Sequence, residues 1–485
     1  MRRLLTSVVG SLALLVLFVP PLNAATAQRP NIVFFLADDL GWADLACYGS
    51  SFHVTPNLDQ LTREGMRFST FYTAGSVCSP TRSSIMTGKY PPRTGVTDWI
   101  PGMKGANRKL VQPHPVSQLA LEEFSLGEAF KAAGYQTFYT GKWHLGGRGF
   151  MPTDQGFDEY VGDDGGEEEE GGGKGAGQAG KLKLRLESTA RFTKASLDFL
   201  MRRDQAKPFL LYLAYHDVHT PIQPMPGLVE YYQEKARGLS GNTPVQIEHD
   251  GQTRMRQDDP AYASMVAAVD QSVAQVRRRL AELGLAENTL VIFTSDNGGL
   301  ATKNGPGPTC NSPLRAGKGW LYEGGIRVPL MAVWPGQIKP GTRSDAPLIS
   351  CDFYPTLLDL AGLPLRPEQH LDGVSFAPLL RGGASPVRPT LYWHYPHYHG
   401  STWTPGAAVR DGDWKLIEFY DYGVVELYNL KQDPVEARNV AAVNPDKKRE
   451  LLDKLHAWQK SVGAIIPDPN PQAAEKASRP KTKRK

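Results

Sequence analysis

Oxygen-bearing side chains occur in adjacent pairs just after two apolar runs of this 485-residue sequence. One pair is Asp38 and Asp39, and the other is Asp296 and Asn297. Hard cations such as Ca²⁺ and Mg²⁺ bind carboxylate and amide oxygens, whereas zinc prefers His and Cys. Either pair alone is more typical of a turn or a helix cap. Together they predict one site for Ca²⁺ or Mg²⁺, provided that the chain turns where each run ends.

A cysteine stands just before a predicted helix in the stretch VCSPTRSSIMTG, which begins at residue 77. Ser79 and Pro80 are typical of an N-cap and a first helical position. The backbone amides of such a start attract anions, and Arg82 can hold an oxyanion with its planar fork. We therefore predict that Cys78 is exposed to solvent or substrate at this positive end. A thiolate nucleophile is the first chemical interpretation, and a buried helix-flanking thiol is the alternative.

Four basic side chains complete the set of residues that could do chemistry: Lys142, His144, His219 and Lys318. Lys142 and His144 are two residues apart and share one side of the chain if that segment is extended. Any one of the four alone is more typical of a surface charge or a core histidine. Next to a metal and a helix start they suit a small anionic oxyester, because cations balance negative charge and a histidine transfers protons near neutral pH.

Short apolar runs immediately precede these polar residues. They cover residues 31–36, 135–139, 208–215 and 289–293, and nearly continuous apolar runs of this length predict strands buried on both faces of a parallel sheet. Helical patterns lie between them. Because ligands of open α/β sheets bind at the carboxyl ends of the strands, we expect the polar strand ends to meet at one site. The predicted fold class is α/β, with a large mostly parallel sheet and helices on both faces.

The first 27 residues predict a secretory signal peptide. Two arginines precede an apolar run, and small residues of the A-x-A kind follow it. An uncleaved anchor is the alternative. No other run is long enough to cross a membrane, so we expect no membrane association after cleavage. The mature sequence has no Asn-x-Ser/Thr site, which favours a periplasmic or secreted bacterial protein.

The remainder divides into a large domain, residues 28–387, and a small one, residues 388–465. In the small domain we predict short antiparallel strands followed by a helix, hence an α+β unit. Residues 466–485 predict a disordered basic tail, and the Gly- and Glu-rich residues 162–180 predict a mobile surface loop. The net charge of +4 comes from the two ends of the chain, and the body carries −4. This balance excludes a nucleic-acid partner on charge grounds.

Taken in chain order, these motifs resemble the type I sulfatases, the formylglycine-dependent, arylsulfatase-like members of the alkaline phosphatase-like superfamily. The segments starting at Cys78, CSPTR, and at Gly141, GKWHLG, are similar to their two signatures. The order Asp-Asp, Cys-x-Pro-x-Arg, Lys-x-His, His-x-Pro, Asp-Asn-Gly, Gly-Lys-Gly is also theirs. Thr81 stands where serine is commoner in the family. The likeness extends from about residue 30 to 465 and implies sulfuric ester hydrolysis on an alkaline phosphatase-like fold.

The resemblance also implies cofactors. Cys78 would be oxidised to formylglycine (3-oxoalanine) by a formylglycine-generating or anaerobic sulfatase-maturing enzyme, and its hydrate would attack the sulfur of a sulfate ester. The metal would be Ca²⁺, with Mg²⁺ as the alternative. Its implied ligands are residue 78 together with Asp38, Asp39, Asp296 and Asn297.

Roles for the basic residues follow from the same resemblance. Arg82 and Lys142 would stabilise the hydrate, and His144 would accept a proton from its second hydroxyl. His219 and Lys318 would bind the sulfate oxygens and assist the departing alcohol.

The substrate expectation rests on aromatic and histidine residues. Trp99, His394 and His397 are predicted to form a rim for a sulfated polysaccharide or oligosaccharide, since aromatic faces stack on sugars and histidines bond hydroxyls. The alternative is that the run around residue 393 forms the core of the small domain. Two rival functions remain open: a phosphodiesterase or phosphonate hydrolase of the same superfamily, and an inactive glycan-binding relative.

Overall fold

The structure of the protein, a computed structural model, describes residues 29–103, 108–114, 116–162 and 187–473. The predicted signal peptide, almost all of the predicted Gly- and Glu-rich loop and the end of the predicted basic tail lie outside these residues. No helix within the described ranges is long and apolar enough to cross a membrane.

A nine-stranded sheet forms the centre of the molecule, in the order β12-β2-β11-β9-β1-β6-β4-β5, with β13 pairing on β2. The strands β9, β1, β6, β4 and β5 run parallel, whereas β11 is antiparallel to both β9 and β2. The bounds are β1 Asn31–Ala37, β2 Met66–Tyr72, β4 Gln136–Gly141, β5 Glu159–Val161, β6 Phe209–Ala214, β9 Thr289–Ser295, β11 Arg327–Val333, β12 Thr342–Ser344 and β13 Leu348–Ile349. The four predicted strands are thus neighbours, and the mostly parallel sheet is confirmed.

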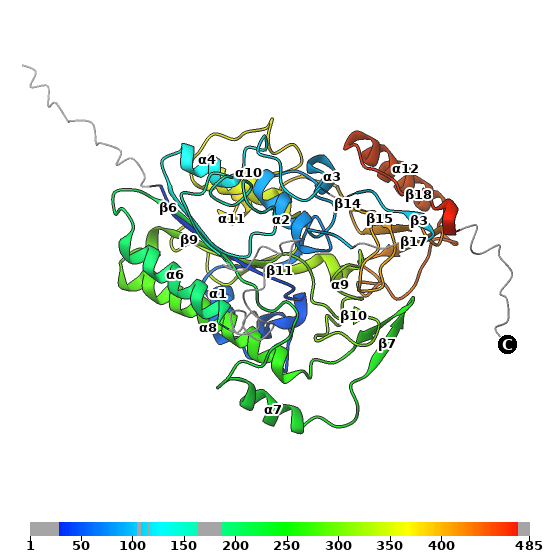
Figure 1. Cartoon of the computed structure of the whole chain (residues 1–485), viewed down its shortest axis with the longest axis horizontal. Helices are drawn as coiled ribbons and strands as arrows, with labels where there is room; N and C mark the ends of the chain where they lie inside the picture. Colours follow the sequence, from blue (N-terminus) through cyan, green and yellow to red (C-terminus); the bar gives the residue numbers. More distant parts are fainter. Residues whose placement is uncertain (1–28, 104–107, 115, 163–186, 474–485) are drawn as a thin grey trace, which may run out of the picture.

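Helices cover both faces of this sheet, because alternate residues of its strands enter two different cores. Phe34 of β1 packs in a core with α2, α4 and α10, and its neighbour Phe35 packs in a core with α1, α6 and α8. Figure 1 shows the first group above the sheet and the second below it. The bounds are α1 Pro56–Glu64, α2 Cys78–Thr87, α4 Leu126–Ala132, α6 Ser188–Arg202, α8 Pro260–Glu282 and α10 Phe353–Leu360. Helices were expected between the apolar runs, and α4 and α8 confirm this.

Two small sheets and several short helices lie outside the large sheet. A three-stranded sheet has the order β10-β8-β7, and β18 pairs with β3. The strand bounds are β3 Leu110–Val111, β7 Val245–Glu248, β8 Gly251–Arg254, β10 Thr302–Lys303 and β18 Asp468–Pro469. The helix bounds are η1 Trp42–Asp44, η2 Ala46–Tyr48, α3 Pro91–Thr94, α7 Val229–Arg237, η3 Ala286–Asn288, α9 Glu323–Ile326, η4 Ser350–Asp352 and α11 Ala377–Leu380.

A four-stranded antiparallel sheet and one long helix form the C-terminal part, as predicted. The bounds are β14 Thr390–Tyr395, β15 Gly406–Asp411, β16 Trp414–Phe419, β17 Val424–Asn429 and α12 Pro445–Ser461. One face of the sheet lies on the large unit, where Trp393 donates from its indole N–H to the carbonyl of Thr73 at 2.7 Å. The other face packs on α12, where the rings of Tyr392 and Trp458 stack at 4.8 Å. The expected boundary at residue 388 stays a prediction.

Candidate active site

The two pairs of oxygen ligands lie side by side because the strands that carry them are paired. Ala37 of β1 is in register with Ser295 of β9, and both strands end there. Asp39 then adopts a left-handed backbone with φ 62°, which turns the chain at the strand end. Its amide N–H donates to Oδ1 of Asp296 at 3.2 Å. The turn that the sequence required for a joint site is therefore present at β1.

Asn297 joins the same cluster. Its Nδ2 donates to Oδ1 of Asp39 at 2.7 Å, while its own Oδ1 is buried without a hydrogen-bond partner. A buried carbonyl oxygen without a donor is costly unless a cation or a ligand meets it. Asp38, Asp39 and Asp296 are also buried. Three carboxylates and an orphaned amide oxygen form a donor set that fits a hard divalent cation.

Three buried cations surround the carboxylates. Lys142 Nζ lies 2.6 Å from Oδ2 of Asp38, and Lys318 Nζ lies 2.7 Å from Oδ1 of Asp39. Arg82 donates from Nε to Oδ2 of Asp296 at 2.9 Å. Each predicted cation therefore pairs with one predicted metal-binding carboxylate.

These charges set the protonation of the cluster. Burial alone would raise the pKa of Asp38, but Lys142 and the other nearby positive groups outweigh burial and hold that pKa well below its usual value. Burial and the neighbouring Asp38 carboxylate raise the pKa of Asp296 to about 7. A carboxyl group with such a raised pKa favours an additional positive charge beside it.

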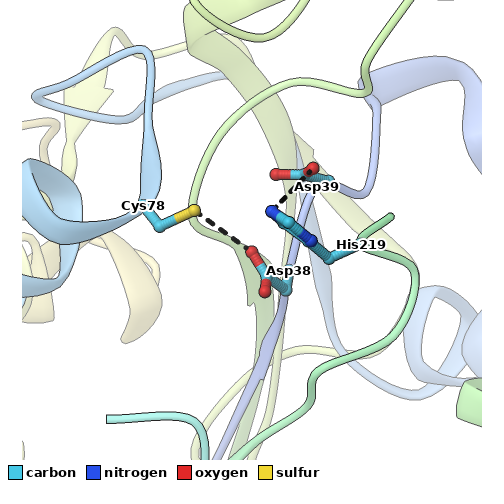
Figure 2. A group of neighbouring side chains, drawn as sticks. All are labelled: Asp38, Asp39, Cys78 and His219. Carbon is cyan, nitrogen blue, oxygen red and sulfur yellow. Dashed lines mark hydrogen bonds and ion pairs between the residues drawn. The ribbon is translucent and has the colours of Figure 1, made fainter. Parts of the chain in front are cut away.

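Cys78 lies inside this cluster (Figure 2) and is only 1% exposed. Its Sγ lies 3.3 Å from Oδ1 of Asp38 and 3.5 Å from Nζ of Lys318. Burial and the Asp38 charge raise the pKa of the thiol to about 12, so it is protonated at neutral pH. Two predictions are therefore wrong for the folded, unmodified chain: the exposed position of Cys78 and its thiolate form.

The helix start also differs from the prediction. The helix begins at Cys78 itself, with Val77 as the N-cap residue, rather than at Pro80. The Ser79 hydroxyl does not cap the helix and instead accepts the backbone N–H of Ile100 at 3.1 Å. This bond holds the segment around Trp99 against residue 78.

The two histidines near the cluster each keep one bare nitrogen. His144 contacts the carbonyl of Ile100 through Nε2, and a carbonyl only accepts, so the ring proton is on Nε2 and Nδ1 has a free lone pair. His219 donates from Nδ1 to the carbonyl of Thr220 at 2.6 Å, which leaves Nε2 bare and 3.8 Å from Oδ2 of Asp39. Burial first, with the charge of a nearby lysine, lowers the pKa of both, for His219 to about 4. Both are neutral proton acceptors at neutral pH.

His219 reaches closer to the metal-binding cluster than the sequence indicated. The ligand atoms of Asp38, Asp39, Cys78 and His219 all lie within 4.8 Å of one another, and Figure 2 shows the four side chains converging. The sequence assigned His219 to the sulfate oxygens and the departing alcohol, and not to the metal-binding cluster. The sequence identified His219 as a functional residue only through its His-x-Pro position after β6.

Of the three predicted rim residues, the structure places only Trp99 at the site. It is half-buried in the loop whose Ile100 contacts both His144 and Ser79. His394 points to the opposite face of its strand, is buried against α12 and contacts the carbonyl of Ile465. It does not belong to the rim, because neighbouring strand residues face opposite sides and Trp393 faces the large unit.

His397 is also buried rather than exposed at a rim. Its Nε2 contacts the hydroxyl of Thr97 at 2.9 Å, so it supports the Trp99 loop from behind. A residue that the sequence did not single out, His399, lies next to Gly319 and close to Lys318. It ends the aromatic and histidine run that begins at Trp393, but its place in the loop after β14 gave no periodic signal.

The arrangement suits hydrolysis of an anionic ester. Buried cations and a site for a divalent ion can hold a tetrahedral anion, and two neutral histidines can move protons beside it. The five metal-binding candidates and the six catalytic candidates of the sequence, which share Cys78, thus gather around the ends of β1, β4, β6 and β9.

Comparisons with known proteins agree with this geometry. The family model described as "Sulfatase" matches residues 30–363, and that described as "N-sulphoglucosamine sulphohydrolase, C-terminal" matches residues 316–461. Arylsulfatase A from Homo sapiens is 33% identical, with 90% of this chain and 88% of that protein covered.

Solved structures share both parts of the fold. Ps i-CgsB in complex with k-i-k-neocarrahexaose superposes with a TM-score of 0.72 and 27% identity, covering 94% of this chain and 98% of that one. BT4656 in complex with its substrate D-glucosamine-2-N,6-O-disulfate has a TM-score of 0.70 and 25% identity, covering 90% and 98%. These similarities extend over the large sheet and the C-terminal sheet alike.

Proposed function

Because the chain belongs to the sulfatase family and is a sulfuric ester hydrolase, we propose that it removes sulfate from a sulfated polysaccharide or its oligosaccharides. The proposal includes a formylglycine made from Cys78, a Ca²⁺ ion, and action in the periplasm or outside the cell. The single observation that carries it is the burial of Cys78 between Asp38 and Lys318, inside the cluster of carboxylates and cations.

Asp38, Asp39, Asp296 and Asn297 would hold the metal. When present, Ca²⁺ would supply Lewis-acid stabilisation of negative charge, and formylglycine would supply a hydrated aldehyde as the nucleophile. The protein residues have separate tasks. Lys142 and Arg82 hold the carboxylates in place around residue 78, and Lys318 presents positive charge on the side of the sulfate.

Proton transfer falls to the two histidines. His144 accepts a proton at Nδ1, the ring nitrogen that the structure leaves bare, while its Nε2–H stays bonded to the carbonyl of Ile100. His219 faces the cluster with Nε2 and serves the departing alcohol. Burial keeps both rings neutral, which suits His144 as a proton acceptor. His219 would first take up at Nε2 the proton that the attacking hydroxyl releases and would then give it to the departing alcohol.

Three features support a saccharide as substrate. The two solved relatives named above are complexes with k-i-k-neocarrahexaose and with D-glucosamine-2-N,6-O-disulfate. Trp99 is half-buried beside the site, and the first 27 residues have the pattern of a secretory signal peptide. Export would bring the enzyme to extracellular polysaccharide. Maturation would require a formylglycine-generating or anaerobic sulfatase-maturing enzyme of the host, which meets the cysteine before folding buries it.

The test has two parts. The tryptic peptide from Phe68 to Arg82 is weighed after purification from the native host. A mass loss that matches replacement of the thiol by an aldehyde is expected, and an unmodified Cys78 in active enzyme refutes the formylglycine proposal. Turnover is then compared for 4-nitrophenyl sulfate, bis(4-nitrophenyl) phosphate, glucosamine 6-sulfate, galactose 6-sulfate and carrageenan oligosaccharides. Preference for the phosphodiester would contradict sulfate ester hydrolysis, and failure on every saccharide would contradict the substrate.

A further inference from the structure

A histidine of the C-terminal part reaches the active site, and the proposed chemistry does not use it. His399 lies in the segment between β14 and β15, which packs on the loop that carries Lys318. The indole N–H of Trp320 donates to the carbonyl of Ser401 at 2.9 Å. At Gly319, where φ is +83°, an added Cβ would lie 2.3 Å from Nδ1 of His399. Only glycine permits this approach, so the histidine and Lys318 are held in a fixed relation.

The ring of His399 has a defined orientation. The backbone N–H of Ser401 donates to Nδ1 at 3.1 Å, and the Ser401 hydroxyl lies 2.8 Å from the same atom. Because Nδ1 accepts a backbone N–H, the proton of the neutral ring is on Nε2. Burial first, and then the charge of Lys318, lower the pKa of His399 to about 3, which keeps the ring neutral. The side chain is partly exposed, and no atom of the described residues makes a hydrogen bond with Nε2.

A neutral donor at this place complements the charged groups. The anionic sulfate is met by positive groups such as Lys318, whose Nζ lies 3.5 Å from Sγ of Cys78. A neutral N–H can donate to an anion or to an uncharged oxygen. Because Lys318 and the other positive groups already meet the sulfate, the His399 N–H is left for an uncharged hydroxyl or ring oxygen. Since Nε2 already carries a proton, His399 does not act as the general base.

The Trp99 loop is tied to the same segment. The hydroxyl of Tyr395 donates to Oδ1 of Asp98 at 2.8 Å, and His397 contacts the hydroxyl of Thr97 at 2.9 Å. Both bonds join the loop to residues just before His399. These bonds join the half-buried Trp99 and the His399 hydrogen-bond donor through connected segments, and an aromatic ring beside a donor is a combination that suits a sugar.

We infer that His399 is a substrate-positioning residue. Its Nε2–H donates a hydrogen bond to an uncharged oxygen of the sugar that carries the sulfate ester. The inference rests on the proposed saccharide substrate, and it names the residue that would distinguish a sugar sulfate from a simple aryl sulfate. Its effect is on substrate placement rather than on bond cleavage.

The experiment compares His399→Ala and His399→Gln with the wild-type full-length mature enzyme. The substrates are 4-nitrophenyl sulfate, which has no sugar oxygens, and the saccharide that the wild-type enzyme hydrolyses fastest among those named under the proposed function. We expect His399→Ala to lower kcat/KM for the saccharide about 10- to 100-fold, mostly through KM, and to affect the aryl sulfate far less. His399→Gln restores most of the saccharide activity, because its amide N–H can occupy the place of Nε2–H. His456→Ala is the matched control, because His456 is exposed on α12, and its activity on both substrates is expected to equal that of the wild type.

The alternative outcomes are distinct. Equal losses on both substrates, or no loss on the saccharide, overturn the inference while the proposed function stands. If His399→Ala melts far below wild type, its kinetics cannot be compared and His399→Gln decides the inference. Equal losses on both substrates in His399→Gln overturn the inference. Near-wild-type saccharide turnover in His399→Gln supports it. If the wild-type enzyme hydrolyses 4-nitrophenyl sulfate but no saccharide of the panel, the proposed substrate class and the inference fall together.

Discussion

Replacing Lys318 by methionine tests the charge balance of the active site most directly. The ammonium group lies 2.7 Å from Oδ1 of Asp39 and 3.5 Å from Sγ of Cys78, and its side chain is almost fully buried. Methionine has a similar length and shape without the charge. The substitution therefore removes one positive charge with little change in packing.

The expected magnitudes differ for activity and stability. Loss of one preorganised charged donor at the reacting group lowers kcat by about 10²- to 10³-fold. Removing one partner of a buried ion pair costs about 3–5 kcal/mol, because Asp39 is left without compensation. With an unfolding entropy of about 2.1 cal/mol/K per residue over about 400 residues, the melting temperature falls by roughly 4–6 °C. A Ca²⁺ ion beside Asp39 would offset part of this loss.

The assay measures kcat with 4-nitrophenyl sulfate and melting temperature with either Ca²⁺ or a chelator. Lys194→Met is the control, since Lys194 is exposed on α6 and its ion pair with Asp198 is at the surface; surface pairs contribute about 0–1 kcal/mol. The reasoning is refuted if Lys318→Met keeps wild-type kcat. A melting-temperature deficit that is no smaller with Ca²⁺ than with chelator would contradict the placement of the ion beside Asp39.

Three other predictions follow from the same structure. Asn297→Ala removes the amide oxygen that has no hydrogen-bond partner, so it should weaken Ca²⁺ binding at least about tenfold. The affinity is measured from the melting temperature as a function of Ca²⁺ concentration, and an unchanged titration excludes Asn297 as a ligand. Burial lowers the pKa of His394 to about 4, so the folded chain binds fewer protons than the unfolded chain between about pH 4 and 6.5, and stability falls as the pH is lowered through that window. His394→Gln should recover about 2 kcal/mol of this loss at pH 5 relative to pH 7.5, and equal pH profiles of unfolding for variant and wild type would contradict it. Lys415→Met leaves Glu323 and Glu436 buried without the cation that contacts both, at 2.9 Å and 2.8 Å. It should lower the free energy of unfolding, measured with denaturant, by about 3–5 kcal/mol. Adding Glu436→Gln should restore part of that stability, and a loss below about 1 kcal/mol would refute the prediction.

The sheet was predictable where its strands are buried on both faces. In β1, β4, β6 and β9 nearly every side chain is buried. Each of these strands is therefore a nearly continuous apolar run, which can be recognised without knowing which strand pairs with it. The strands β2 and β11 were not predicted, because β2 carries half-buried polar residues and its pairing with β11 joins segments more than 200 residues apart. Local patterns contain no information on such pairings.

Residue types and chain order determined which side chains could do chemistry here. Two pairs of oxygen ligands, a cysteine, two of the three cations and two histidines were identifiable because they stand beside a predicted strand end or helix start. Lys318 was identifiable from the order of the motifs. Their convergence was predictable from the rule that parallel strands end at one edge.

Only the tertiary structure decided what each of these side chains does. Cys78 is protonated because burial raises the pKa of its thiol, and the charge of Asp38, 40 residues away, raises it further. His394 faces α12 and His399 faces the Lys318 loop because the pleat of β14 and the close approach at Gly319 set their directions. Side-chain direction, burial and charge compensation arise from contacts between distant segments. No single stretch of the sequence encodes them.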